Sequence, residues 1–430
     1  MTMTTPLDNG ATGRTGVSAM MTESRQGDER APQPQVESVG RTRRLRVAMD
    51  VQSLQTARTG VRTYVDELLR EFARPDAPHR VVPLAGPKRL PSGVRLFRII
   101  NQAMYFPWLH LWLPLRLWLG RYDVLFSPEY LTARWTPVPR VVTFHDAMFL
   151  RRPQDYNRLW LRVFHWVSLP ALRRSAAVIV PSRHAAVEAA TYAGIAPDRI
   201  HVVPQGGPTG GEPMRVQDAD ATSVLARYGL APGAYVLHVG VLERRKNLVT
   251  LVRAFDQYRR RQAAESTGEG TPDGWKLVLV GQPGPRPDLD DSQHIRRAIA
   301  ELGLDDDVIL TGHVAIAERN ALYTRAGAVA VPSLYEGFGI PVLEAFAAGV
   351  PVLCARATSL PEVAGDAALY FDPGSVDELA GAIARVAGDA ELRARLVAAG
   401  AERVREFTWA RTAAETLAVF EAVARRRARP

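Results

Sequence analysis

The chain has 430 residues, of which 47% are hydrophobic and 23% are charged, and its formal net charge is +9. This length exceeds what one hydrophobic core usually holds, so two domains are expected, and the composition excludes an extended disordered chain. The single cysteine, Cys354, excludes an intramolecular disulfide and a cysteine-held metal cluster, and with no recognisable signal sequence it indicates a reducing cytoplasm.

The excess positive charge comes from arginine, which is concentrated in a few segments. These are residues 41–46, 88–98, 151–162, 173–174 and 425–429. Such charge suits three kinds of partner, which are nucleic acid, anionic lipid and a phosphate-bearing substrate. The simpler interpretation is that these arginines lie on a solvated surface. The arginines come without an aromatic platform or a recognised module, so nucleic-acid binding is not expected.

The first elements follow a polar tail. Residues 1–43 have no apolar period and predict disorder. The run RLRVAMDV is typical of a buried parallel strand, and the segment after it predicts a loop with Gly60 and then an amphipathic helix. Gly60 would allow close approach of a ligand to the backbone, and turn geometry explains it equally well.

Residues 105–120, YFPWLHLWLPLRLWLG, form the longest apolar stretch. They are too few to span a bilayer and are interrupted by Pro107, Pro114 and Arg116, so a transmembrane helix is not expected. A half-buried helix that leads into a strand is the favoured interpretation. A helix in a lipid interface is the alternative, because tryptophan and arginine suit that position, and it would bring peripheral contact with an anionic membrane.

Short Val/Leu/Ile runs separated by helical segments then predict two α/β halves, each a doubly wound parallel sheet. The first series continues with YDVLFSP, RVVTFHD, AAVIVPS and IHVVPQG, and the second contains AYVLHVG, KLVLVG, VILTGHV, AVAVPS and VPVLCA. Glycine and proline are dense over residues 204–220, which places the boundary there. The predicted domains are 44–215 and 216–408, followed by 409–430.

Ligands of parallel sheets bind beyond the carboxyl ends of the strands. One such end carries YEGFG, with Glu336 separated by seven residues from Glu344, and Pro341 suits the first turn of a helix. A glycine loop before a helix N-terminus is an anion site, and carboxylates accept hydrogen bonds from the hydroxyls of polyols. The pattern favours a phosphate between two polyols, although turn geometry and the helix dipole explain the same residues without a ligand.

A second strand end has Gly240, followed by Arg245 and Lys246 just before a helix that Asn247 would cap. This arrangement predicts a diphosphate clamp, with a solvated basic turn as the alternative. In the first half, His145 and Asp146 end a strand, and such a pair is often only a local hydrogen bond. The acidic runs 288–291 and 305–307 are typical of turns and caps, so the sequence predicts no metal site.

Three stretches resemble the retaining GT-B glycosyltransferases of family 4, over about residues 45–425. They are LHVGVLERRKNLVTLVRAF, residues 312–373 and FTWARTAAETL. The resemblance implies two Rossmann-like domains facing a central cleft, with the acceptor on domain 44–215 and a nucleotide sugar on domain 216–408. The helix from Trp409 would cross back onto the first domain, and a basic tail would follow it.

The resemblance also implies roles for individual residues. Glu336 would contact the donor sugar without acting as a nucleophile, Arg245 and Lys246 would neutralise the phosphates, and His145 would approach the sugar from the first domain. The remaining donor-binding residues would be Gly240, Val314, Gly337, Phe338, Gly339, Ile340 and Glu344, the last on the ribose, and the acceptor-side residues would be Gly60 and Asp146. Many members have an arginine where this chain has Val241, a departure that concerns the phosphate clamp.

We therefore expect retaining transfer of a hexose from a nucleoside diphosphate sugar to a saccharide or lipid-linked acceptor, in polysaccharide or glycoconjugate biosynthesis. No metal or other cofactor is expected. The RKN turn and the TFHD strand end resemble the subgroup that often uses mannose donors. The expected location is the cytoplasm, at the inner face of a membrane. Two alternatives remain, a noncatalytic nucleotide-sugar-binding subunit or membrane-surface scaffold, and a nucleotide-sugar epimerase of the same fold.

Overall fold

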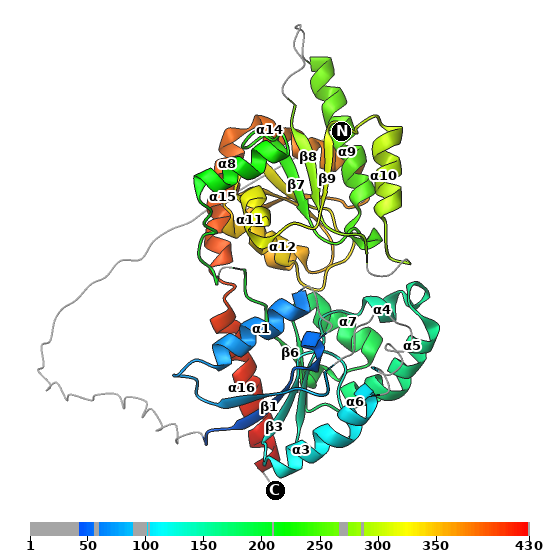
Figure 1. Cartoon of the computed structure of the whole chain (residues 1–430), viewed down its shortest axis with the longest axis vertical. Coiled ribbons are helices and arrows are strands. Elements are labelled where there is room, and N and C mark those ends of the chain that lie inside the picture. Colours follow the sequence, from blue (N-terminus) through cyan, green and yellow to red (C-terminus); the bar gives the residue numbers. More distant parts are fainter. Residues whose placement is uncertain are drawn as a thin grey trace, which may run out of the picture. The chain divides into compact units, whose positions relative to one another are not determined.

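Two parallel sheets of six strands each organise the chain in a computed structural model (Figure 1). The structure describes residues 43–55, 60–88, 101, 104–208, 210–265, 274–284 and 288–428. The predicted tail lies outside these residues except for Arg43, and so does most of the basic segment 88–98. The two-sheet α/β fold that the apolar runs predict is confirmed.

The first sheet has the strand order β2-β1-β3-β4-β5-β6. Its strands are β1 (Arg46–Asp50), β2 (Arg80–Leu84), β3 (Val124–Ser127), β4 (Arg140–Thr143), β5 (Ala177–Val180) and β6 (Ile200–Val202). The accompanying helices are α1 (Gly60–Phe72), α3 (Leu113–Leu119), α4 (Met148–Arg151), α5 (Arg158–Val163), α6 (Leu169–Arg173) and α7 (Arg183–Ala193). We call these elements, together with α16 (Trp409–Ala428), the first lobe.

The second sheet has the order β12-β11-β10-β7-β8-β9. Its strands are β7 (Tyr235–Val239), β8 (Lys276–Val280), β9 (Val308–Gly312), β10 (Ala328–Val331), β11 (Val352–Ala355) and β12 (Ala368–Phe371). Its helices are α8 (Asp218–Arg227), α9 (Leu248–Glu265), α10 (Ser292–Glu301), α11 (Ile316–Thr324), α12 (Ile340–Ala347), α13 (Leu360–Ala364), α14 (Val376–Gly388) and α15 (Ala390–Val404). These elements form the second lobe.

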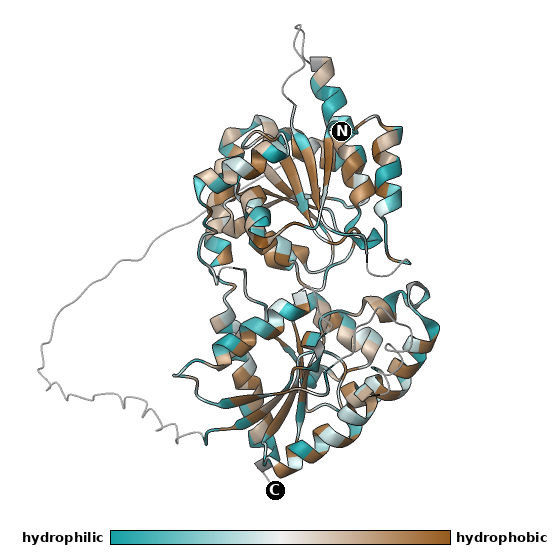
Figure 2. Ribbon diagram, in the orientation of Figure 1, coloured by the Kyte–Doolittle hydropathy of each residue, from teal (hydrophilic) through white to brown (hydrophobic). Residues whose placement is uncertain are grey.

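The sheets are apolar because helices cover them, and Figure 2 shows the strands largely in brown. The helix α16 belongs to the core of the first lobe, where Phe420 packs against Phe126 and Phe72 with ring centroids 5.1 and 6.3 Å apart. The hydroxyl of Thr412 also donates to the carbonyl of Pro204, in the segment that follows β6. The end of the chain therefore helps to hold the first sheet.

The apolar segment 105–120 is helical and has one buried face, formed by Trp108, Leu109, Leu113 and Leu117. It contains a π-helical turn at Trp108–Trp112, in which the N–H of Leu113 donates to the carbonyl of Trp108. Pro114 follows this turn and has no N–H to donate to the preceding turn. The helix ends at Gly120, shortly before β3. No helix in the described parts of the chain is long and apolar enough to cross a membrane.

Candidate functional site

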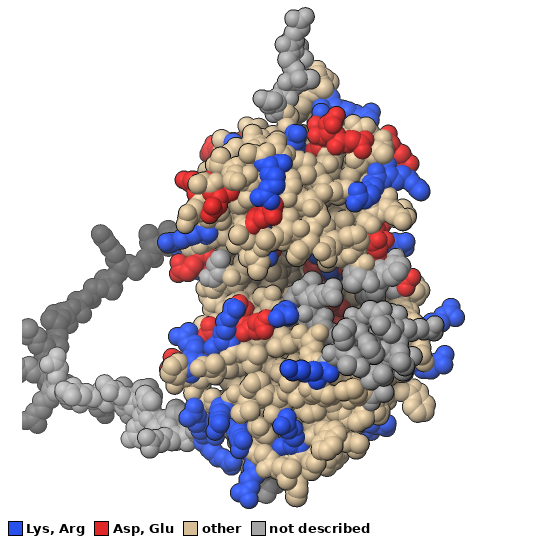
Figure 3. Space-filling model, in the orientation of Figure 1, with Lys and Arg blue, Asp and Glu red and all other residues tan. Residues whose placement is uncertain are grey.

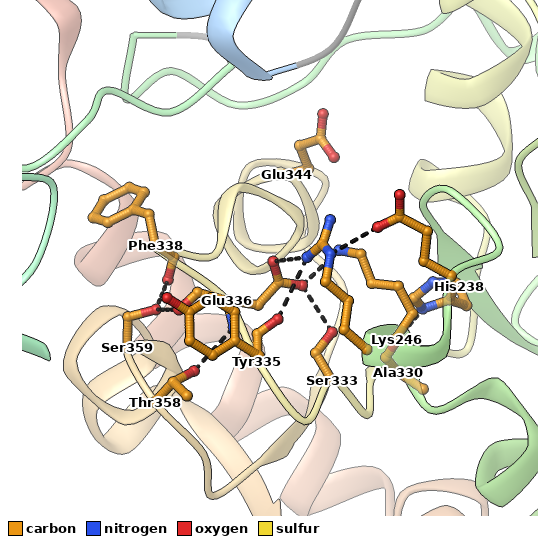
Figure 4. A network of polar contacts seen from close by, with 12 residues as sticks. His238, Lys246, Ala330, Ser333, Tyr335, Glu336, Phe338, Glu344, Thr358 and Ser359 are labelled. Atoms are coloured by element: carbon orange, nitrogen blue, oxygen red, sulfur yellow. Dashed lines mark hydrogen bonds and ion pairs between the residues drawn. The ribbon is translucent and has the colours of Figure 1, made fainter. Parts of the chain in front are cut away.

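The loop after β10 places Glu336 in a buried network of opposite charges (Figure 4). Its Oε1 lies 2.5 Å from Nζ of Lys246, and its Oε2 lies 3.0 Å from Nη1 of Arg245. The hydroxyl of Ser333 donates to Oε1 at 2.7 Å. Burial raises the pKa of Glu336, but the charges of Lys246 and Arg245 outweigh burial and lower it to about 2. Glu336 is therefore ionised and fixed in position.

The two cations lie in a 3-10 turn, Arg244–Lys246, directly before α9. Burial lowers the pKa of Lys246 and Arg245 repels its proton, while the carboxylate of Glu336 opposes both effects. The turn is tied to the loop after β10, because the N–H of Leu334 donates to the carbonyl of Arg245 at 2.8 Å. Asn247 precedes α9 as expected, and its Oδ1 accepts from the hydroxyl of Thr250. Two loops thus form one network of charges, in which Glu243 also pairs with Arg245 at 2.8 Å.

The backbone from Gly337 to Ile340 offers hydrogen-bond donors at the start of α12. In the described part of the chain, the N–H groups of these four residues donate to no protein acceptor. Gly339 has φ of +128°, a conformation that side chains with Cβ rarely adopt, and it aligns the loop with the helix. Free N–H groups at the positive end of a helix suit a phosphate.

Glu344 belongs to a separate network on α12. Its Oε2 accepts from the hydroxyl of Tyr323 at 2.8 Å, and its Oε1 lies 3.1 Å from Nη1 of Arg319. In Figure 4 its carboxylate points away from Glu336. The two glutamates of the motif therefore occupy different surroundings.

His145 follows β4 with both ring nitrogens engaged. Its Nε2 lies 2.9 Å from the carbonyl of Pro128, which can only accept, so Nε2 carries the proton. Its Nδ1 accepts from the amide of Gln205 at 3.2 Å. Burial lowers the pKa of His145 to about 4, despite the bond to Pro128. The ring is neutral above this pH.

Residues 44–430 form one compact unit, and within it the loop of Gly337 approaches the loop after β4. A Cβ at Gly337 would lie 2.4 Å from the carbonyl oxygen of His145. The hydroxyl of Tyr335 accepts from the N–H of Ala147 at 3.0 Å and donates to the carboxylate of Glu188. The backbone of His145 thus lies beside the loop that carries Glu336.

A pocket of about 180 Å³ opens beside this network. It is lined by Asp146, Met148, Arg152 and Tyr156 from the first lobe and by Glu243, Arg244, Arg245, Leu289 and Tyr335 from the second. Burial raises the pKa of Asp146, although the N–H of Met148 and the charge of Arg245 oppose this. The pocket combines three guanidinium groups and two carboxylates with the apolar surfaces of Met148, Leu289 and two tyrosines, so it suits a group with both polar and apolar parts.

The other predicted residues differ in their surroundings. Gly240 lies at the end of β7, where a Cβ would be 3.1 Å from Nε2 of His238. The side chains of Val314 and Phe338 are packed in the second core, which leaves only their backbones for a ligand. Ile340 begins α12 and is half-buried. Gly60 begins α1, and none of the described atoms lies within 4 Å of a Cβ built there, so crowding by the described residues does not explain this glycine.

The acidic runs serve local structure where they are described. Asp290 accepts from the N–H groups of Gly284 and Ser292, both at 3.1 Å, and from the hydroxyl of Ser292. Among the described residues, no group of three or more His, Cys, Asp or Glu side chains is arranged to hold a metal ion.

Comparison with known families identifies the chain. Residues 230–403 match the model of glycosyl transferases group 1, and residues 58–209 match that of glycosyltransferase family 4. The chain is a family 4-like group 1 glycosyltransferase. The first match covers every element of the second lobe that surrounds Glu336, including the turn with Arg245.

Two relatives of this glycosyltransferase are mannosyltransferases by name. O-antigen chain mannosyltransferase B of Escherichia coli is 32% identical over 204 residues, which are 47% of this chain and 50% of that protein. The chain thus aligns with only half the length of this relative. MMP alpha-(1->4)-mannosyltransferase of Mycolicibacterium hassiacum is 29% identical over 325 residues, or 71% of this chain and 72% of that one.

A solved structure shows the same fold. HepE of Anabaena, in complex with UDP and glucose, superposes with a TM-score of 0.63 over 87% of this chain and 99% of its own, at 19% identity. At this identity the similarity shows the fold alone, and the expected GT-B fold is confirmed.

Residues that the sequence analysis did not select also hold the loop of Glu336. Thr358 accepts from the N–H of Glu336 at 3.0 Å, and the hydroxyl of Ser359 lies 2.9 and 2.7 Å from the carbonyls of Glu336 and Phe338. Both residues follow β11, so the strand-end rule would have selected them. Tyr335 likewise belongs to the strand-end loop YEGFG, whereas Arg319 lies on α11 and carries no comparable signal.

Proposed function

We propose that the protein transfers a hexose, with retention of the anomeric configuration, from a nucleoside diphosphate sugar to a saccharide or lipid-linked acceptor. Arg245 and Lys246 converge on Glu336 beside the N–H groups of residues 337–340, which have no acceptor among the described residues, and this convergence carries the proposal. Fixed positive charge and free donors are what the diphosphate of such a donor requires.

In this proposal the residues of the second lobe act on the donor. Arg245 and Lys246 stabilise the charge that develops on the departing nucleoside diphosphate, which is where electrostatic stabilisation accelerates the reaction. Glu336 binds sugar hydroxyls and holds both cations in place, and Glu344 binds the ribose. His145 closes the sugar subsite from the first lobe as a neutral ring. Because two side-chain cations are present, we propose that the reaction needs no divalent metal.

Mannose is the proposed sugar, because the names of both relatives describe mannosyltransferases. We assign the acceptor to the pocket that Asp146 lines, with Gly60 also on the acceptor side. The arginines of this pocket suit an acceptor that carries phosphate, as a lipid-linked saccharide does. The proposal includes glycoconjugate or polysaccharide biosynthesis in the cytoplasm, at the inner face of a membrane.

The experiment is incubation of the protein with a panel of nucleoside diphosphate sugars, with and without saccharide acceptors, followed by NMR of the products. Acceptor-dependent transfer with the donor's anomeric configuration is the expected result. Inversion would contradict the mechanism, and an epimerised nucleotide sugar formed without acceptor would favour the epimerase. Tight donor binding with no product from any acceptor would favour the noncatalytic subunit.

A further inference from the structure

Large apolar side chains are exposed on one region of the first lobe. Among the described residues fifteen large apolar side chains are exposed, and ten of them lie between positions 106 and 166. They are Phe106, Leu111, Trp112, Leu115, Trp118, Leu119, Trp135, Leu159, Val163 and Trp166. The indole rings are the most prominent, with 67% of Trp118 and 76% of Trp166 exposed. So dense a set indicates a partner surface rather than scattered surface residues.

The helices that carry these side chains already have their own buried faces. The segment 104–119 buries Leu113 and Leu117, and α5 with the π-helical turn after it buries Leu161 and Phe164. The outward apolar residues are therefore not needed to pack the helices onto the sheet. A surface helix that is apolar on both faces has a second apolar contact to make.

One loop contacts both helical segments. The N–H of Arg134 donates to Nδ1 of His110 at 3.3 Å, and the ring of Tyr130 lies 5.6 Å from that of Phe164. The exposed Trp135 follows Arg134 in this loop. In Figure 1 the labels α3, α6 and α5 follow one side of the first lobe.

Arginines accompany the exposed apolar residues. Neither residues 104–121 nor residues 156–174 contain a carboxylate, and the exposed arginines of the region are Arg116, Arg121, Arg134, Arg158, Arg162, Arg173 and Arg174. No ion pair involves any of them within the part of the chain that the structure describes. Figure 3 likewise shows more blue than red over the face of the first lobe that it draws.

We propose that this apolar–arginine surface docks the protein on an anionic lipid bilayer. Tryptophan and leucine enter the interfacial region, and the arginines bind headgroup phosphates. The charge selects this partner, because two copies of the chain would oppose arginine to arginine, whereas an anionic membrane complements them. The surface reaches the acceptor-side pocket, since Tyr156 of the pocket stacks on Trp160 of α5 with ring centroids 6.2 Å apart.

The docking inference does not depend on the proposed transfer reaction, because it concerns binding alone. The test is flotation of the full chain with vesicles of phosphatidylcholine, with and without phosphatidylglycerol. We expect binding to the anionic vesicles that falls as salt rises. The double variant Trp112→Ser/Trp118→Ser and the double variant Arg158→Gln/Arg162→Gln should each bind at least about tenfold more weakly. The matched control is Ile316→Ser, whose side chain is 71% exposed on the second lobe and whose binding should not change.

Three results would overturn the inference. One is equal binding of the wild type to both kinds of vesicle, and another is an equal loss of binding in the control variant. The third is a dimer in light scattering that the tryptophan variant dissociates, because the surface would then join two copies of the chain. If a variant unfolds, quenching of wild-type tryptophan fluorescence by brominated anionic lipid decides the question, and an absence of quenching counts against docking.

Discussion

The ammonium group of Lys246 lies 2.5 Å from Oε1 of Glu336, and both side chains are buried. Ninety positions separate the two residues in the sequence, yet the turn before α9 and the loop after β10 bring them together. Arg245 contacts the other carboxylate oxygen. Glu243 also pairs with Arg245, at 2.8 Å, so Glu336 of the donor-sugar motif shares the task of holding the cations with a second carboxylate.

Replacement of Lys246 by methionine should destabilise the protein, because it leaves part of the charge of Glu336 uncompensated. The expected loss is about 3 kcal/mol of unfolding free energy at neutral pH. The pKa of Glu336 is lowered to about 2, so the stabilisation is complete above its unfolded value and is lost as pH falls toward 2. Chemical unfolding of wild type and Lys246→Met should therefore differ less at about pH 3 than at about pH 7. If the difference in unfolding free energy between the wild type and Lys246→Met does not change with pH, the stabilising role of the ion pair is contradicted.

Replacement of Gly337 by alanine should abolish most of the activity without unfolding the second lobe. The new Cβ would lie 2.4 Å from the backbone oxygen of His145, so one of the two loops must move. We expect a loss of at least about a hundredfold in kcat/KM, because misplaced loops misalign the reacting groups. The matched control is Gly381→Ala on α14, where no atom lies within 4 Å of the new Cβ. Equal kinetics of the two variants would show that the close approach does not matter.

Stability should fall on mild acidification because two histidines, the half-buried His145 and the buried His238, resist protonation. Burial lowers the pKa of His145 and of His238 to about 4, and Lys246 adds to the effect at His238. Between about pH 6.5 and 4 the unfolded chain binds protons that the folded chain does not, so each histidine costs about 2 kcal/mol at about pH 5. His238→Asn keeps a donor toward the carbonyl of Ala330 and should reduce this pH dependence. If the unfolding free energy of His238→Asn falls with pH as steeply as that of the wild type, His238 does not contribute to the pH dependence.

Substitution of Glu344 by glutamine should weaken donor binding more than it slows the chemical step. The carboxylate accepts from Tyr323 and pairs with Arg319, and its proposed ligand is the ribose rather than the reacting sugar. We expect KM for the donor to rise about tenfold with little change in kcat. Arg319→Ala should have the same effect, because it releases the carboxylate. A fall in kcat at unchanged KM would place Glu344 at the reacting centre.

Much of the fold is predictable from the sequence because the inner strands are continuous apolar runs. The two strands that the sequence analysis missed, β2 and β12, are outer strands of their sheets. The outer strand β2 contains Pro83, which interrupts the strand pattern and which an outer strand tolerates, because proline has no N–H for a partner strand.

The site is predictable only as far as local sequence specifies it. The glycine loop and the RRK turn give Glu336, Arg245 and Lys246 through their places at strand ends. The engagement of both ring nitrogens of His145 depends on Pro128 and Gln205, which no local pattern connects with it. The packing of Val314 and Phe338 into the core likewise depends on the tertiary structure.

The most direct test of the central claim is calorimetric titration of the protein with nucleoside diphosphates in the presence of a chelator. If Arg245 and Lys246 form the diphosphate site, one nucleotide should bind without metal, and Lys246→Met should weaken it at least about tenfold. The control Arg260→Met, an exposed residue of α9 paired with Asp256, should bind as the wild type does. Binding that requires a divalent ion, or that survives in Lys246→Met, would contradict the account.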